Sequence, residues 1–137
     1  MSIFVDSSAW FAAAVVRDRC NARATAILQS EPDHVTTDHI VVETWLLLNA
    51  RFHSRAANLF WERLRRSRVE IEHVGAADFE RAWIIGELFP DQNFSIVDRT
   101  SFAVMERLGL NRAASFDDDF AVYRYGRNRD RAFEVLR

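Results

Sequence analysis

Four acidic residues adjoin apolar runs that should be buried, and they are the residues best suited to chemistry: Asp6, Glu43, Asp98 and Asp117. Carboxylates packed close together repel one another, and a bound Mg²⁺ or Mn²⁺ relieves the repulsion by supplying positive charge. Hard cations choose oxygen ligands, and Mg²⁺ keeps several waters, which leaves room for a phosphate oxygen and an attacking water. The residue types therefore indicate metal-dependent hydrolysis of a phosphodiester bond.

Each of these acids, taken alone, also has a structural explanation. Asp6 could cap a helix that starts directly after it, and Asp98 has capping-box spacing from the serine three residues earlier. Asp117 opens a run of three aspartates that could form a solvated turn. Glu43 is harder to explain in this way because an unpaired glutamate is rarely buried, although a basic neighbour could pair with it. The chemical interpretation therefore depends on a fold that brings the four together.

The elements that would position these acids alternate between strand and helix. Short apolar or alternating runs predict strands, and apolar stretches that begin at capping residues predict helices. Strands are expected at 3–5, 34–36, 69–74 and 113–116, with at most one more near residue 133. Helices are expected at 7–16, 21–29, 38–52, 54–67, 77–88 and between the cap Ser95 and Gly109. This alternation predicts an α/β domain with a mostly parallel sheet and right-handed crossovers.

The expected topology gives two of the acids a position. In open parallel sheets, ligands bind outside the carboxyl ends of the strands. Asp6 follows the first predicted strand and Asp117 follows the fourth. The two would share one rim of the sheet if those strands are neighbours. The period-two alternation at 69–74 predicts a half-exposed strand nearer the edge.

Length and composition fit a single domain over residues 1–137, because 49% of the residues are hydrophobic, enough for one core. The longest apolar run, 10–16, is far short of the roughly 20 residues that a membrane span needs, and the chain begins without a basic segment. The single cysteine, Cys20, cannot form an internal disulfide. We therefore expect a cytoplasmic protein that makes no membrane contact.

Charge is unevenly distributed, although the net charge is only −2. That net charge argues against a protein that coats nucleic acid through bulk electrostatics. Residues 51–68 contain six arginines and one glutamate, whereas residues 69–98 contain seven acids and one arginine. A further basic run near the acidic rim includes Arg124 and Arg127. Contact with a nucleic-acid backbone is one interpretation of that run, and a solvated surface is the other.

Four segments together resemble a known family. They are 4–9 (Phe-Val-Asp-Ser-Ser-Ala), 41–43 (Val-Val-Glu), 94–109 with its Ser-x-x-Asp helix start, and 114–120 with its Ser-Phe-Asp-x-x-Phe sequence. In order and spacing they resemble the PIN domain of VapC-type toxins, and the resemblance extends from residue 3 to about residue 125. It implies a PIN-like three-layer sandwich, in which a central, mostly parallel sheet of four to five strands is flanked by helices.

The resemblance also implies a function. It implies a Mg²⁺- or Mn²⁺-dependent endoribonuclease that cleaves RNA by metal-activated water and is the toxin of a type II toxin-antitoxin pair. The expected partners are RNA, a small cognate antitoxin protein and a second copy of the chain. DNA contact is expected only indirectly, through the antitoxin.

By the same resemblance, individual residues take roles. The catalytic quartet is Asp6, Glu43, Asp98 and Asp117, of which Asp6, Asp98 and Asp117 hold metal. Supporting positions are Ser7, Ser115 and Asp119, the last as a fifth acid. The chain departs from the family pattern at Val97 and Arg99, and Arg99 could place an RNA-binding cation near the acids, together with Arg124 and Arg127.

Other functions are open on the sequence alone. A PIN-like domain could process RNA without being a toxin, or could bind a partner without catalysis. A phosphatase with an aspartyl nucleophile would want a second acid two residues after Asp6, where the chain has Ser8. A phospho-acceptor receiver domain relies on a lysine, and the chain contains none.

Overall fold

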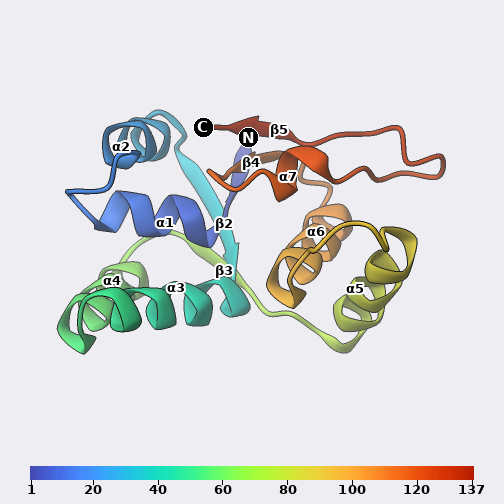
Figure 1. Ribbon diagram of the computed structural model, residues 1–137. Helices are drawn as coiled ribbons and strands as arrows, with labels where there is room; N and C mark the ends of the chain where they lie inside the picture. Colours follow the sequence, from blue (N-terminus) through green and yellow to red (C-terminus); the bar gives the residue numbers. More distant parts are fainter.

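The computed structural model describes residues 1–137 and contains one five-stranded sheet, with all strands parallel and in the order β3-β2-β1-β4-β5 (Figure 1). The strands are β1 (Ser2–Val5), β2 (Asp33–Thr37), β3 (Glu70–Glu72), β4 (Arg112–Ala114) and β5 (Glu134–Leu136). The short, half-exposed β3 lies at the edge, as its alternating sequence predicts. The α/β prediction and the parallel sheet are thus confirmed.

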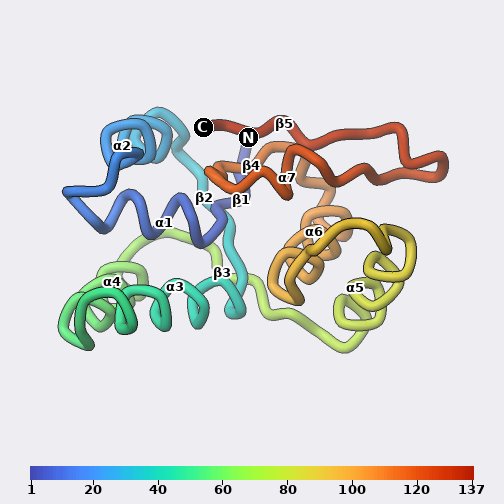
Figure 2. Tube along the Cα trace, viewed as in Figure 1, coloured from blue at the N-terminus to red at the C-terminus, as the bar shows by residue number.

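Helices flank the sheet on both sides, with α1 and α2 to the left and α5 and α6 to the right in Figure 1. The tube in Figure 2 shows two helix pairs that pack together, α3 with α4 and α5 with α6. The bounds are α1 (Ser7–Ala14), α2 (Asn21–Ser30), α3 (Asp38–Arg51), α4 (Ser54–Arg66), α5 (Ala76–Leu88), α6 (Ile96–Leu108) and α7 (Asp119–Val122). No helix is both long and apolar enough to span a bilayer.

Helix ends follow the local chemistry of the sequence. The hydroxyl of Thr37 accepts the N–H of Ile40 at 3.1 Å and so caps α3. Gly109 ends α6 in the left-handed conformation, with φ at 69°, which a residue without Cβ adopts at little cost. These ends place Glu43 within α3 and fix the direction in which the chain leaves α6 for β4.

An aromatic stack joins the elements that carry the acids. The rings of Phe102 in α6 and Tyr123 lie parallel, with centroids 4.3 Å apart, and Phe102 also meets Phe120 of α7 edge-on at 5.0 Å. Phe120 in turn packs on Phe4 of β1. All four side chains are buried. This packing holds α7, α6 and β1 in fixed relation at one end of the sheet.

Several elements differ from the sequence prediction. Strand β3 is shorter than the expected 69–74, and β4 ends at Ala114 instead of residue 116. Residues Asp119–Val122 form the short helix α7, which was not expected because a single turn is too short for a periodic pattern. Helix α1 ends at Ala14, two residues early, since Val15 is already extended. The optional last strand is present as β5, paired with β4 from Arg112 to Ala114.

Candidate active site

The site lies at the carboxyl ends of β1 and β4. These strands are neighbours, with Val5 opposite Ala114, and the N–H of Asp6 continues the ladder to the carbonyl of Ala114 at 3.0 Å. The chain then leaves β4 through Ser115 toward Asp117. The predicted sharing of one rim is therefore confirmed for the backbone at Asp6 and Asp117.

Asp6 is buried among hydroxyl groups and is only 2% exposed. Its Oδ2 accepts hydrogen bonds from Ser8 Oγ at 2.8 Å and from Ser115 Oγ at 2.9 Å. It also caps α1 by accepting the N–H of Ser8 at 3.4 Å. Burial raises the pKa of Asp6, and these hydrogen bonds partly oppose that rise. Asp6 is thus a helix cap and a member of the acidic site at once.

Asp98 has the same double character. It forms a capping box with Ser95, whose N–H donates to Asp98 Oδ2 at 3.2 Å and whose Oγ accepts from Asp98 N at 3.1 Å. Burial raises the pKa of Asp98 to about 8, with further contributions from Asp119, Asp6 and Asp117. A buried carboxylate that holds its proton so strongly lacks a compensating positive charge.

Three carboxylates come closest together: one oxygen from each of Asp98, Asp117 and Asp119 lies within 4.8 Å of the others. The loop between β4 and α7 arranges two of them. Asp117 donates its N–H to Ser115 Oγ at 3.1 Å and accepts the N–H of Asp119 on Oδ1 at 3.0 Å. Burial raises the pKa of Asp119, with Asp117 adding to the rise.

Glu43 reaches the same region from α3. Its Oε1 accepts a hydrogen bond from Ser7 Oγ, while no hydrogen bond occupies its Oε2. Burial raises the pKa of Glu43, and the charges of Asp6 and Asp117 raise it further. The four acids of the predicted quartet and Asp119 thus form one acidic group, since their charges act on one another's pKa values. Only Asp98, Asp117 and Asp119 are close neighbours in it, and Asp6 and Glu43 lie outside their 4.8 Å cluster.

The group has no cationic partner in the protein. None of the ion pairs of the chain involves these five acids, whereas the neighbouring Asp118 pairs with Arg137. All the available donors are carboxylate or hydroxyl oxygens, the ligands that Mg²⁺ and Mn²⁺ prefer. These clustered acids have no positive charge from the protein beside them, and their donor atoms are all oxygens. Both properties fit the binding of a divalent cation.

Comparison with known proteins identifies the family. The PIN domain family matches residues 3–125 of the chain. The chain belongs to the PIN-domain family. It is 39% identical over 121 residues to the 23S rRNA-specific endonuclease VapC20 of Mycobacterium tuberculosis, a match that covers 88% of this chain and 92% of the relative. The chain is therefore also a homologue of VapC-type toxins.

Solved structures agree with this assignment. The crystal structure of Mycobacterium tuberculosis VapC20, described as a sarcin–ricin loop cleaving toxin, superposes with a TM-score of 0.80 at 39% identity and covers 85% of this chain and 91% of that one. FitAcB from Neisseria gonorrhoeae superposes with a TM-score of 0.62 over 100% of this chain and 97% of that one. At 20% identity, the second likeness shows the fold alone.

The arginines suggested by the sequence do not join the acids of this PIN domain. Arg99 donates Nε–H to the carbonyl of Phe94 at 3.0 Å, and its guanidinium lies against Gly86 of α5. Arg124 donates to the carbonyls of residues 121–123, where it completes the end of α7. Arg127 is exposed in the loop after Tyr125. From the sequence, we expected the guanidinium of Arg99 to lie beside the acids. It lies instead at the contact between α5 and α6.

Ser8 is a site residue that the sequence reasoning missed. Its Oγ donates to Asp6, lies 3.3 Å from Ser115 Oγ and accepts the N–H of Phe116 at 2.9 Å. It therefore ties the ends of β1 and β4 together. The Asp-x-Ser spacing at a predicted helix start could have indicated it, because a serine two residues after a capping aspartate is within reach of that carboxylate.

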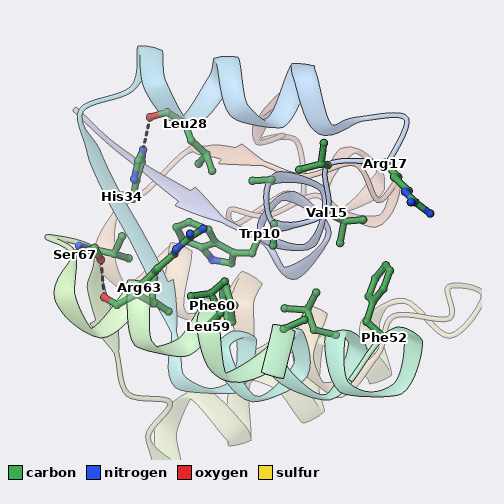
Figure 3. Close-up of a pocket in the computed structure, with 17 residues that line it drawn as sticks. Trp10, Val15, Arg17, Leu28, His34, Phe52, Leu59, Phe60, Arg63 and Ser67 are labelled. Carbon is green, nitrogen blue, oxygen red and sulfur yellow. Dashed lines mark hydrogen bonds between the residues drawn. The ribbon is translucent and has the colours of Figure 1, made fainter. Parts of the chain in front are cut away.

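Two grooves flank α1. One, of about 420 Å³, adjoins the acids and includes Ser7, Glu43 and Asp117 in its lining. The other, of about 680 Å³, is mainly apolar and lies between α1, α2 and the α3–α4 pair, with Trp10, Leu59 and Phe60 pointing into it (Figure 3). Helix α1 thus separates a polar groove from an apolar one.

Proposed function

We propose that residues 1–137 act as one nuclease domain, a Mg²⁺- or Mn²⁺-dependent endoribonuclease that is the toxin of a toxin-antitoxin pair and works in the cytoplasm. The observation that carries this proposal is the cluster of Asp98, Asp117 and Asp119, whose oxygens lie within 4.8 Å without a cation from the protein. The 39% identity to a named RNA endonuclease supports RNA as the substrate.

We assign the metal to the carboxylates at the rim. Asp6, Asp98 and Asp117 hold it, and Asp119 completes the set on the side of α7. When bound, the ion supplies positive charge that stabilises the developing charge on the phosphate and its leaving oxygen. Ser8 and Ser115 hold the Asp6 carboxylate in a fixed orientation through their hydrogen bonds to Oδ2.

Glu43 is the residue we assign to the attacking water. Ser7 fixes Oε1, which leaves Oε2 to accept a proton from water as its oxygen bonds to phosphorus. The bond from phosphorus to the 3′ oxygen then breaks, and that oxygen takes a proton from solvent. The products carry a 5′-phosphate and a 3′-hydroxyl. A raised pKa suits this role, because the base then operates nearer to neutral pH.

We propose 23S ribosomal RNA as the substrate, at the sarcin–ricin loop. The proposal rests on the relative, which is 39% identical over 92% of its length, is named for that RNA and has a solved structure described as a sarcin–ricin loop cleaving toxin. In the test, ribosomes and a synthetic sarcin–ricin stem-loop are incubated with the protein in Mg²⁺, in Mn²⁺ and in EDTA, and RNA ends are mapped. One cut that disappears in EDTA is expected. Cutting unaffected by EDTA would refute the metal assignment.

A matched pair of variants locates the activity in the cluster. Asp117→Asn should abolish cleavage, whereas Asp118→Asn should retain it, because Asp118 is exposed and pairs with Arg137. Circular dichroism checks that both variants are folded. Equal activity in the two variants would remove the cluster from the mechanism.

We propose that the antitoxin binds the apolar groove of Figure 3. Its lining combines thirteen hydrophobic residues with Arg17 and Arg63, neither of which has an ion-pair partner. An apolar segment with acidic flanks would match it in shape and charge. Leu59→Asp should weaken capture of the co-expressed antitoxin while RNA cleavage continues.

We further propose that the chain dimerises through α5. This helix exposes Phe79, Trp83 and Ile84, and Trp83 is 66% exposed. Contiguous apolar side chains of this size mark protein interfaces. Light scattering should give a dimer for the native chain and a monomer for Trp83→Glu.

A further inference from the structure

The groove beside the acids continues away from them toward two arginines. Its lining includes Glu43 and Asp117 and also Arg19 and Arg51. Arg51 lies two helical turns beyond Glu43 in α3, and Arg19 follows the C-terminal end of α1, whose N-terminal end adjoins Asp6. Glu43, Leu47 and Arg51 follow one another at four-residue spacing, so they share one face of α3 and all line the groove. Eight residues of helix correspond to about 12 Å. The groove therefore joins an acidic end to a basic end over the span of a short piece of nucleic-acid strand.

Arg51 is held in place but keeps its hydrogen-bond donors free. Its guanidinium carbon lies 5.1 Å from the centre of the Phe11 ring, a cation–π contact that fixes the planar group. It forms no ion pair, even though Glu43 shares its groove. A guanidinium held in this way can direct its N–H groups outward in the fork that matches a phosphate.

Arg19 is exposed and also unpaired, whereas four other arginines already have partners. Arg107 and Arg112 are committed to carboxylates, and Arg99 and Arg124 to backbone carbonyls. Asp18, the one acid near Arg19 in the groove lining, turns its Oδ1 to the N–H of Cys20 at 2.8 Å. The basic end of the groove thus presents two cations with available donors.

We propose that Arg19 and Arg51 bind the sugar-phosphate backbone of the substrate RNA beside the cleavage site and so position the scissile phosphate at the acids. This inference rests on the proposed ribonuclease function and names residues that bind its substrate. A polyanion placed along the groove meets cations at one end and the metal-binding acids at the other. Phosphate contacts of this kind fix the position of the RNA along the groove without recognising its base sequence.

The test compares Arg51→Ala and Arg19→Ala with Arg68→Ala, an exposed, unpaired arginine that lines neither groove. Steady-state cleavage of the stem-loop is measured in Mg²⁺ over a series of KCl concentrations. We expect KM to rise about tenfold for each groove variant with kcat changed little. The slope of log kcat/KM against log[KCl] should become shallower by about 0.7 for each phosphate that the variant no longer binds. Arg51→Lys should recover part of the affinity, since it keeps the charge but not the planar group.

Separate outcomes distinguish the two proposals. If the native chain cuts RNA and both groove variants match Arg68→Ala in KM and in salt dependence, the inference about the arginines is overturned while the ribonuclease proposal stands. If the native chain cuts no RNA, the ribonuclease proposal fails. Fluorescence anisotropy of labelled RNA then still decides whether the arginines bind it, with unchanged affinity in the groove variants as the overturning result.

Discussion

The first turns of α5 and α6 have nearly the same local structure and opposite electrostatics. Asp78 and Asp98 each stand third in their helix, are 4% and 7% exposed, and accept the N–H of the capping residue on Oδ2. Asp78 also receives two N–H groups from Arg107, at 2.9 and 3.0 Å, which lower its pKa. Asp98 receives no cation, and burial together with Asp119, Asp6 and Asp117 raises its pKa to about 8. The two helices therefore share the capping motif and differ in the residue that faces the acid. Asp78 is neutralised by Arg107 and has a structural role, whereas Asp98 has no cation from the protein and can bind the metal that we propose.

The sharpest test of this comparison exchanges each aspartate for asparagine. Asp98→Asn should lower kcat/KM for RNA by about 100-fold or more, because a charge is lost at the site where we propose that the metal binds. Asp78→Asn should leave kcat/KM within about threefold. Cleavage assays at fixed metal concentration measure both values, and an equal loss of activity in the two variants would contradict the division of roles.

The same two variants should move stability in opposite directions. Asp78→Asn weakens a charge-assisted pair with the partly exposed Arg107, which costs about 1–2 kcal/mol and lowers Tm by a few degrees. Asp98→Asn should hold or raise the metal-free Tm, because it removes an uncompensated buried acid. Thermal unfolding in EDTA distinguishes these results.

A smaller effect is expected in the pH dependence of the metal-free protein. Since the pKa of Asp98 is raised on folding, the folded state binds its proton more tightly than the unfolded state does. Stability from this group is therefore complete at acidic pH and is lost as the pH rises to about 8. Tm in EDTA should fall by several degrees between pH 5 and pH 8, and Asp98→Asn should flatten the curve.

Metal should reverse this trend. Added Mg²⁺ or Mn²⁺ binds the ionised acids of the folded state and stabilises it by mass action, so the gain in Tm should be larger at pH 8 than at pH 5. Asp78→Asn should show the same pH trend and metal response as the native chain, because Asp78 already has its cation in Arg107. If the Tm of the native chain changed with neither pH nor metal, the assignment of Asp98 to the metal site would be contradicted.

The sequence was sufficient for the α/β class and for most helices and strands because those signals are local. Strand and helix positions follow from apolar periodicity and caps, and Ser95, Gly109 and the edge position of β3 are all where the sequence predicts them. The shared rim of Asp6 and Asp117 depended on β1 and β4 being neighbours, which the sequence left open and the strand order shows. Helix α7 was not predictable, since one turn of helix has no period to detect.

The partners of individual side chains could not be predicted in the same way. Arg99 stands next to Asp98 in sequence, yet the absence of a side chain at Gly86 lets its guanidinium settle on α5. Asp98 and Asp78 also look alike in sequence, each at the start of an apolar helix. Only the packing of α6 on α5 shows that Arg107 reaches one of them and not the other.

Asp119 gives the next comparison, with its neighbour Asp118. Asp119 shares the 4.8 Å cluster, whereas Asp118 is exposed and pairs with Arg137. Asp119→Asn should reduce kcat/KM about tenfold and weaken metal affinity, since it alters the oxygen set around the ion. Asp118→Asn should leave both unchanged. Isothermal titration with Mn²⁺ measures affinity, and equal affinities in the two variants would leave Asp119 outside the metal site.

The smallest effect concerns the hydroxyl groups around Asp6. Their hydrogen bonds lower the pKa of Asp6, as Arg107 lowers the pKa of Asp78, but they bring no positive charge. Ser115→Ala removes a 2.9 Å donor to Asp6 and the acceptor for the N–H of Asp117. Because that donor lowers the pKa of Asp6, its loss lets burial raise the pKa further. The acidic limb of the pH–kcat/KM profile should therefore move to higher pH, with a loss of about two- to fivefold at neutral pH.

Ser101→Ala is the matched control for this last effect. Its hydroxyl is equally buried but donates to the Val97 carbonyl inside α6, at 2.7 Å and away from Asp6. A structural loss common to both serines would lower Tm in both variants without moving the pH profile. A shift of the acidic limb in Ser115→Ala alone would show that the hydroxyl acts through the ionisation of Asp6. If the acidic limb of the pH profile moved in neither variant, Ser115 would have no influence on the ionisation of Asp6. Asp6 would then resemble Asp98, which has no cationic partner in the protein.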